Sequence, residues 1–234
     1  MFQFSTLPAL SLGLYDGEMT FGELLKHGDF GLGTLDGLDG ELIILDGKAW
    51  QVGYDGKVSR VGKKATTPFA IITRFAPDQT VKVTQPQPLD ALKRQVGLLL
   101  PTGNVAYAIA IKGTFSRMKV RSVPKQSKPF RPLAEVVKGQ SVWEWKNVRG
   151  TLVGFQFPGS LSGVNLADIH FHFISDDKQQ GGHLLDCELQ EGQVSVQALR
   201  GFEMQLPVGE SFDRANLGAD QSEALKATEQ AGIH

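Results

Sequence analysis

The sequence has little cysteine. Cys187 is the single thiol among 234 residues, which excludes a disulfide framework within the chain and is typical of a reducing compartment. Long hydrophobic runs are also absent: Pro8 interrupts the partly apolar N-terminal stretch, residues 2–14, and no basic segment precedes it. We therefore expect a cytoplasmic protein with no membrane partner.

Neither sign of charge is in excess, because 24 Lys and Arg stand against 25 Asp and Glu. This balance argues against nucleic acid as a partner. The sequence contains neither a glycine-rich dinucleotide loop nor a phosphate-binding loop, so no organic cofactor is expected. With 41% hydrophobic residues, the chain can bury its own core, as one large domain or as two closely packed halves.

Histidines are few but clustered: three of the five, His170, His172 and His183, lie within fourteen residues. Residues 169–175 alternate and are rich in aromatics, which predicts a strand with His170 and His172 on one face. Residues 176–182 are polar and end in glycine, so His183 should open an antiparallel return strand. The third imidazole would then lie beside the first two.

Three imidazoles without a fourth protein ligand are typical of a catalytic metal site, because a structural zinc normally has four protein ligands. Cys187 alone cannot complete such a set. The alternative is three ordinary polar residues on a half-exposed strand. The spacing favours a metal but does not identify it: imidazole suits zinc, copper, iron and nickel, and zinc is only the commoner occupant.

Short β-prone runs separated by turns predict an α+β fold that is dominated by mixed or antiparallel sheet, with a few short helices. Asp-Gly pairs between residues 31 and 58 indicate successive hairpins. Further strands are predicted at residues 69–75, 79–84, 105–121, 141–145, 150–157, 183–189, 194–199 and 202–206. Helices are expected after Thr20 and at residues 89–100, while residues 222–229 could form a helix or a frayed tail.

Two charged residues lie in unusual settings. Arg121 precedes a proline-rich run, residues 122–132, whose rigid path is of the type that lines sites, and its guanidinium could hold a carboxylate with two hydrogen bonds. Glu41 shares a predicted strand face with Ile43 and Leu45. It either marks the strand end at the water boundary or is buried with a raised proton affinity.

Four strings occur in the chain in this order: Gly31-Leu-Gly-Thr-Leu-Asp-Gly-Leu-Asp-Gly-Glu41, Arg121-Ser-Val-Pro-Lys-Gln126, Gly150-Thr-Leu-Val-Gly-Phe155, and His170-Phe-His172 with Gly181-Gly-His183. Together they resemble the α-acetolactate decarboxylase family, and the resemblance covers nearly the whole chain. It implies that His170, His172 and His183 hold Zn²⁺. It also implies that Arg121 is the essential arginine of the family.

The resemblance places carboxylates in the site as well. Glu41 matches the first essential glutamate of the family, and Thr34 matches a residue that faces the substrate pocket. A second glutamate comes from the C-terminal tail of the family and falls by register on Glu229, with Glu223 and Glu210 as alternatives. The family also implies two β-rich halves, which we divide near residue 140: residues 1–140 would supply Glu41 and Arg121, and residues 141–234 would supply the zinc hairpin and tail.

The implied activity is zinc-dependent decarboxylation of (S)-2-acetolactate to (R)-acetoin and CO₂. Loss of the carboxylate leaves an electron pair that delocalises into the neighbouring ketone as an enediolate, and zinc held by neutral imidazoles can act as a Lewis acid. Arg121 would orient the departing carboxylate. Glu41 and Glu229 would deliver the proton, and either could be the donor.

Two other functions stay open. The histidines could stabilise a metal-binding interaction module without turnover, or serve another zinc lyase or hydrolase on the same scaffold. A merely structural zinc would not require Arg121 and two carboxylates, whereas release of CO₂ would separate a decarboxylase from a hydrolase. Exposed β edges are compatible with a homodimer.

Overall fold

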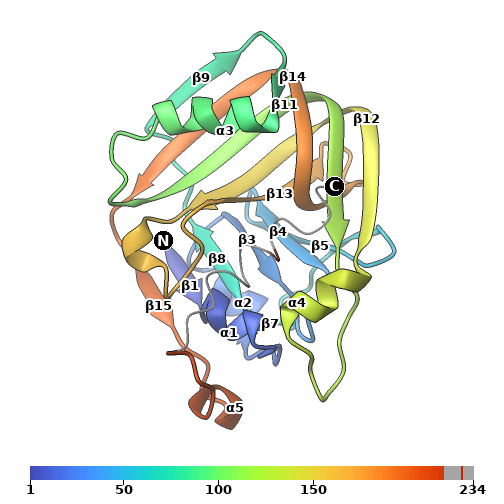
Figure 1. The fold of residues 1–234 in the computed structure, drawn as a ribbon, viewed down its shortest axis with the longest axis vertical. Helices are drawn as coiled ribbons and strands as arrows, with labels where there is room; N and C mark the ends of the chain where they lie inside the picture. Colours follow the sequence, from blue (N-terminus) through green and yellow to red (C-terminus); the bar gives the residue numbers. More distant parts are fainter. Residues whose placement is uncertain (219–227, 229–234) are drawn as a thin grey trace.

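A computed structural model of the chain describes residues 1–218 and Thr228. Two large sheets lie one above the other, and the helices are short (Figure 1). The predicted α+β class with dominant sheet is confirmed. Within the described residues, no helix is long and apolar enough to cross a membrane.

The first sheet has seven strands in the order β15-β1-β8-β3-β4-β5-β6. Their bounds are β1 Phe2–Phe4, β3 Phe30–Thr34, β4 Glu41–Leu45, β5 Lys48–Val52, β6 Val58–Arg60, β8 Ala70–Thr73 and β15 Glu203–Gln205. All neighbours are antiparallel except β1 and β15, which run parallel. A separate short ladder joins β2, Met19–Thr20, to β7, Thr66–Thr67.

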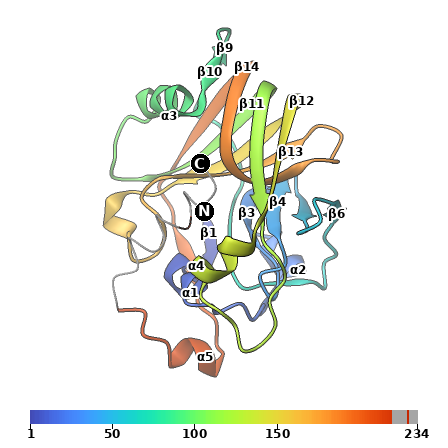
Figure 2. The ribbon, with the colours of Figure 1, turned by 45° about the vertical axis from the view of Figure 1, so that its right-hand side comes forward.

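The second sheet is built from longer strands and curls strongly (Figure 2). Its members are β9 Gln79–Val83, β10 Gln87–Pro88, β11 Ala106–Ser122, β12 Ser141–Gln156, β13 Ile169–Ser175 and β14 Gly181–Leu199. Strand β14 pairs with β11, β11 with β12 and β12 with β13, and the end of β13 pairs again with β14. The four longest strands therefore close into a small barrel.

The helices cover the ends and one side of these sheets. They are α1 Leu7–Ser11, α2 Phe21–Leu24, α3 Leu89–Leu98, α4 Leu133–Val136 and α5 Glu210–Asp213, with 3-10 turns at Val137–Gly139 and Gly159–Leu161. In α3, Leu92 and Val96 are four residues apart and both fully buried, which is the spacing of one helix face. The helix predicted at residues 222–229 falls outside the described residues, apart from Thr228.

Side-chain alternation in the two sheets creates the cores. Ile43 of β4 joins the core between the sheets, whereas its neighbours Leu42 and Ile44 pack on the opposite face of the first sheet. Phe171 and Phe173 of β13 point into the barrel. The odd positions of β4 and the even positions of β13 therefore face each other between the sheets.

Two pairs of predicted strands are in fact single strands. Residues 141–145 and 150–157 both belong to β12, and residues 183–189 and 194–199 both belong to β14. The predicted strands left gaps at residues 146–149 and 190–193, but pairing with β11 continues through the first gap and pairing with β11 and β9 through the second. A division into halves near residue 140 stays a prediction. The chain enters the second sheet at β9 and returns to the first at β15.

Candidate active site

The three clustered histidines converge between the two sheets. His172 on β13 lies directly opposite His183 on β14 in the ladder that closes the barrel. Nε2 of His170 lies 3.1 Å from Nε2 of His172 and 3.0 Å from Nδ1 of His183. Nitrogens bound to one tetrahedral zinc at about 2.1 Å would be about 3.4 Å apart. The group could therefore hold a metal ion with small side-chain adjustments.

The protonation of these rings suits metal binding. Burial, followed by the charge of Arg121, lowers the pKa of His170 to about 3. Burial also lowers the pKa of His172 well below its ordinary value. Both rings are therefore neutral near pH 7, and a neutral imidazole has a nitrogen lone pair for a metal.

The tautomer of His172 follows from one hydrogen bond. Its Nδ1 lies 2.8 Å from the carbonyl oxygen of Leu42 on β4. A carbonyl can only accept, so Nδ1 carries the proton and Nε2 keeps its lone pair. That Nε2 is the atom that faces His170. A backbone group of the first sheet thus orients a candidate ligand of the second.

Glu41 enters the same site from the first strand of a hairpin. The preceding Gly40 has φ +76°, and a Cβ there would lie 2.2 Å from the carbonyl oxygen of Val52, so the turn requires glycine. Glu41 is 7% exposed, and its Oε2 lies 3.4 Å from Nε2 of His172. The sequence left two interpretations of Glu41: a strand end at the water boundary, or a buried carboxyl group. The structure supports the second, because the side chain is buried.

Thr34 lies opposite Glu41 in the ladder between β3 and β4. Its hydroxyl donates a 2.7 Å hydrogen bond to the carbonyl of Gly40. Thr34 thus fixes the turn that begins β4, and it also lines the cavity beside the histidines.

Arg121 approaches from β11, where it pairs with His183 of β14. Close contact between these strands needs Gly182, because its φ is +146° and a Cβ would lie 2.5 Å from the Arg121 carbonyl oxygen. The side chain is 4% exposed. Nη1 donates to Oε1 of Gln140 at 3.1 Å and to the Thr228 carbonyl at 2.9 Å. These bonds fix the guanidinium in one orientation.

One small cavity collects all of these groups. It is lined by the three histidines together with Thr34, Glu41 and Arg121. Its remaining wall is mainly apolar and includes Leu7 and Leu10 of α1, Leu133 of α4 and Val137 of the turn that follows. Polar groups that converge within an apolar wall are typical of a small-molecule site.

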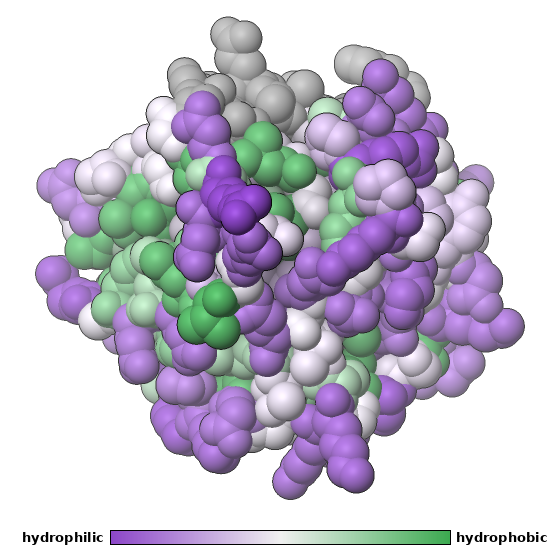
Figure 3. Space-filling model, turned by 90° about the horizontal axis from the view of Figure 1, so that it is seen from below, coloured by the Kyte–Doolittle hydropathy of each residue, from purple (hydrophilic) through white to green (hydrophobic). Residues whose placement is uncertain are grey.

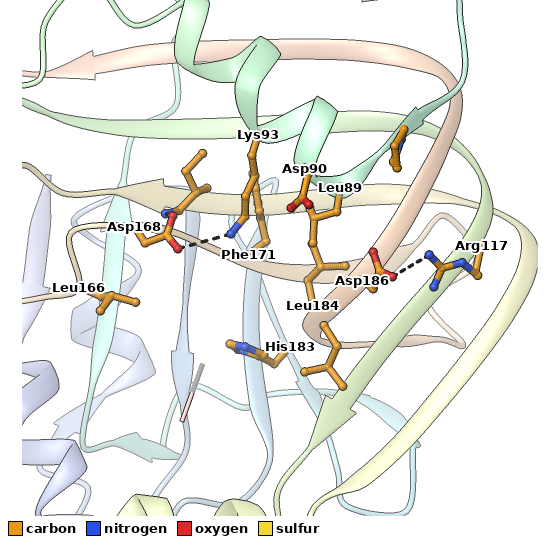
Figure 4. Close-up of a pocket in the computed structure, with 13 residues that line it drawn as sticks. Leu89, Asp90, Lys93, Arg117, Leu166, Asp168, Phe171, His183, Leu184 and Asp186 are labelled. Atoms are coloured by element: carbon orange, nitrogen blue, oxygen red, sulfur yellow. Dashed lines mark hydrogen bonds and ion pairs between the residues drawn. The ribbon is translucent and has the colours of Figure 1, made fainter. Parts of the chain in front are cut away.

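A larger cavity of about 390 Å³ lies beside His183, near α3 and the start of β13 (Figure 4). Four of its charged groups form two ion pairs: Lys93 Nζ lies 3.5 Å from Asp168 Oδ2, and Arg117 Nη2 lies 2.7 Å from Asp186 Oδ2. Of the three histidines, only His183 lines it. The smaller cavity is therefore the better candidate for chemistry.

The second predicted glutamate is not placed. Glu229 and Glu223 fall outside the described residues. Glu210, the third possibility, is exposed on α5 and forms an ion pair with Arg214. Nothing in the structure brings Glu210 to the histidines, since α5 lies at the lower end of the molecule (Figure 1).

The sequence analysis missed several contributors. Gln140 has no motif that would mark it as a partner of Arg121, and the role of Leu42 depends on its backbone carbonyl, which any residue carries. The apolar wall from α1 and α4 also went unnoticed, because isolated leucines have no signal that separates a pocket wall from a core.

Comparison with known proteins decides the family. The family model of alpha-acetolactate decarboxylase matches residues 1–219. The chain belongs to this family. It is 43% identical over 230 residues to the alpha-acetolactate decarboxylase of Methanosarcina mazei, covering 98% of this chain and 80% of that protein. The same enzyme of Methylococcus capsulatus is also 43% identical, with 98% and 88% covered.

A solved member of the family has the same fold. The crystal structure of alpha-acetolactate decarboxylase from Bacillus subtilis strain 168 superposes with a TM-score of 0.94, covers 99% of this chain and 98% of its own, and is 35% identical. The prediction of an enzyme of the carboxy-lyase class is confirmed by this membership.

Proposed function

We propose that the chain decarboxylates (S)-2-acetolactate to (R)-acetoin and CO₂ with Zn²⁺ held by His170, His172 and His183. The observation that carries this proposal is the convergence of three buried imidazoles with Glu41 and Arg121 around one cavity, in a member of the alpha-acetolactate decarboxylase family.

The histidines supply the part of the site that would hold the metal. Neutral rings leave the full positive charge of a divalent ion uncompensated, and three ligands leave coordination positions open. When bound, the metal would supply a Lewis acid for the negative charge that develops on the substrate oxygens. The low pKa of His170 keeps this donor available well below neutral pH.

Arg121 would bind and orient the substrate carboxylate. Its guanidinium is buried and held by two carbonyl oxygens, those of the Gln140 side chain and the Thr228 backbone. Such a fixed group can hold the breaking C–C bond in line with the π system of the adjacent ketone. When that bond breaks, CO₂ leaves, and the electron pair moves into the ketone to give an enediolate.

Glu41 would deliver the proton that completes the reaction. It lies beside His172 at the edge of the cavity, where it can hold a proton for the carbon that has lost the carboxylate. One face of the planar enediolate would receive the proton, which gives a single enantiomer of acetoin.

Glu229 remains the proposed second glutamate of the site, and Thr34 is proposed to contact the substrate. A homodimer and a cytoplasmic location also stay predictions.

The experiment that tests the function measures CO₂ and acetoin from racemic acetolactate. We expect both products from the purified protein, their loss after chelation, and their recovery when Zn²⁺ is restored. Metal analysis of the same sample would identify the native ion. Turnover that persists after the metal has been removed would exclude the metal-dependent mechanism, and binding of zinc without any turnover would favour the interaction module.

A further inference from the structure

Two short helices close the small cavity with aliphatic side chains. Leu7 and Leu10 are three residues apart on α1, and both line the cavity. So do Leu133 at the start of α4 and Val137, four residues later in the adjoining 3-10 turn. Side chains at these spacings share one face of a helix. Because α1 and α4 contact each other below the strands that carry the histidines (Figure 1), the four side chains form one apolar surface, the helix wall.

Contacts outside the cavity hold the two helices together. Gly13, just after α1, has φ +91°, and a Cβ there would lie 3.0 Å from the carbonyl oxygen of Arg131, so the two backbones approach closely. The ring centroids of Tyr15 and Phe130 are 5.3 Å apart. Seen from below, the side of the molecule on which the helices lie shows hydrophilic side chains with smaller hydrophobic patches between them (Figure 3). The helix wall is thus a packed layer between solvent and the cavity, and it cannot yield to a larger ligand without loss of these contacts.

The free space behind this wall is small. It amounts to about 40 Å³, against about 390 Å³ in the larger cavity beside His183. Protein interiors are packed so closely that one added methylene group is felt by its neighbours. A ligand that fills the small cavity therefore has no room for a longer alkyl chain unless the wall moves.

Acetolactate would direct its oxygens to the charged and imidazole groups of the cavity. Its carboxylate, hydroxyl and ketone groups are suited to Arg121, Glu41 and the site of the three histidines, all of which line the same cavity. Two methyl groups remain, one on the ketone carbon and one on C2. Burial of methyl groups against aliphatic side chains is favourable, so the helix wall is the surface that suits them.

We infer that the helix wall sets the upper limit on the length of the alkyl groups that the substrate carries, and that Leu10 and Leu133 impose this limit. Of the four side chains in the wall, these two keep the most accessible surface, 7% each, so their truncation should add the most space. The inference rests on the proposed function. It assigns to α1 and α4 a role in specificity that is separate from the chemistry of the polar groups.

Competition between substrates measures the limit. Racemic acetolactate would be mixed with homologues that carry ethyl or propyl in place of the C2 methyl group, and the hydroxyketone products would be separated. The ratio of kcat/KM values does not depend on the amount of active enzyme, so partial loss of folding or of metal leaves it unchanged. We expect the unmodified protein to favour methyl over propyl by at least about 10-fold. Leu10→Ala and Leu133→Ala should each raise the relative kcat/KM for propyl by about 10-fold or more.

Further variants keep the test independent of fold stability. Leu10→Val and Leu133→Val each remove one methylene group at a smaller cost in stability than alanine, and they should shift the ratio in the same direction. Val137→Ile adds one methylene group to the wall and should lower the relative rate for the ethyl homologue. Leu24→Ala is the matched control, because Leu24 is fully buried on the opposite face of the first sheet and its truncation should leave the ratio unchanged.

Three results would overturn the inference. They are equal kcat/KM values for methyl and propyl in the unmodified protein, a ratio that neither Leu10→Ala nor Leu133→Ala alters, and a shift in Leu24→Ala as large as theirs. A propyl ratio that rises only in the helix-wall variants would support it.

Binding without turnover separates this inference from the proposed function. Acids that carry the 2-hydroxyl group but lack the ketone cannot form the enediolate, and calorimetry gives their dissociation constants as the alkyl group on C2 lengthens. The unmodified protein should bind the propyl acid at least about 10-fold more weakly than the methyl acid, and Leu10→Ala should remove most of this difference. This pattern without release of CO₂ from acetolactate would refute the proposed function alone. Release of CO₂ with equal binding of all chain lengths would refute the role of the helix wall alone.

Discussion

Nε2 of His172 lies 3.4 Å from Oε2 of Glu41, and the two residues belong to different sheets. The contact resembles an ion pair, but burial holds the pKa of His172 far below neutrality, so the ring is neutral. A neutral imidazole and a carboxyl group at this distance can share one proton. The first sheet thus places a carboxyl group beside a candidate ligand of the second.

Glu41→Gln should reduce decarboxylation by at least about 100-fold, because the amide cannot donate a proton as an acid does. Metal content should remain unchanged, since the three imidazoles are retained. CO₂ release and metal analysis measure the two effects. Glu191→Gln is a matched control: Glu191 is exposed on β14, and its replacement should leave the rate unaltered. Full activity in Glu41→Gln would remove Glu41 from the proton delivery.

His183→Ala should abolish both metal binding and turnover, because two imidazoles cannot replace three in a site that must hold its ion through catalysis. A ligand in 100-fold excess over its dissociation constant stabilises a protein by about 2.7 kcal/mol, so added Zn²⁺ should raise the Tm of the unmodified protein but not of the variant. His27→Ala is the control. His27 stacks on Phe2 of the first sheet, and its replacement should leave the response to zinc unchanged. A zinc-dependent Tm rise in His183→Ala would contradict the proposed ligand set.

As the pH falls, the metal-free protein should lose stability at a higher pH than a protein without buried neutral histidines. His170 has a pKa of about 3 when folded and about 6.5 when unfolded, so the unfolded chain binds the proton first as the pH falls. The stability that the neutral ring contributes is complete above pH 6.5 and decreases below it, by up to about 1.4 kcal/mol per pH unit and buried ring. Urea midpoints after chelation should therefore fall from pH 6.5 to 5. Midpoints that stay constant over this interval would show that the rings are not buried in the neutral form.

Cys187 should be unreactive in the native protein. Burial raises the pKa of its thiol to about 12, and only the thiolate attacks disulfide reagents. At pH 8 we expect no reaction with a chromogenic disulfide until urea unfolds the chain, after which one thiol per chain should react. Fast labelling without denaturant would mean that the interior of the barrel opens readily.

Local pattern was enough to predict the hairpin that carries the three histidines. Alternation in residues 169–175 placed His170 and His172 opposite Phe171, and the polar turn returned the chain at His183; the structure has this arrangement. The reason is that side-chain direction in a strand depends only on the parity of the position. The gaps predicted at residues 146–149 and 190–193 were wrong, because pairing with neighbouring strands outweighs the weak strand preference of the polar residues there.

The sequence by itself determined the donor types, the face on which two histidines point, and the sheet-rich class, since these follow from residue chemistry and periodicity. Only the tertiary structure decided that β4 lies against β13, that the Leu42 carbonyl fixes the tautomer of His172, and that Gln140 holds Arg121. Those contacts join residues far apart in the chain, and no local preference specifies them. They arise because two sheets bury their apolar faces against each other, which brings together whatever polar groups stand between them.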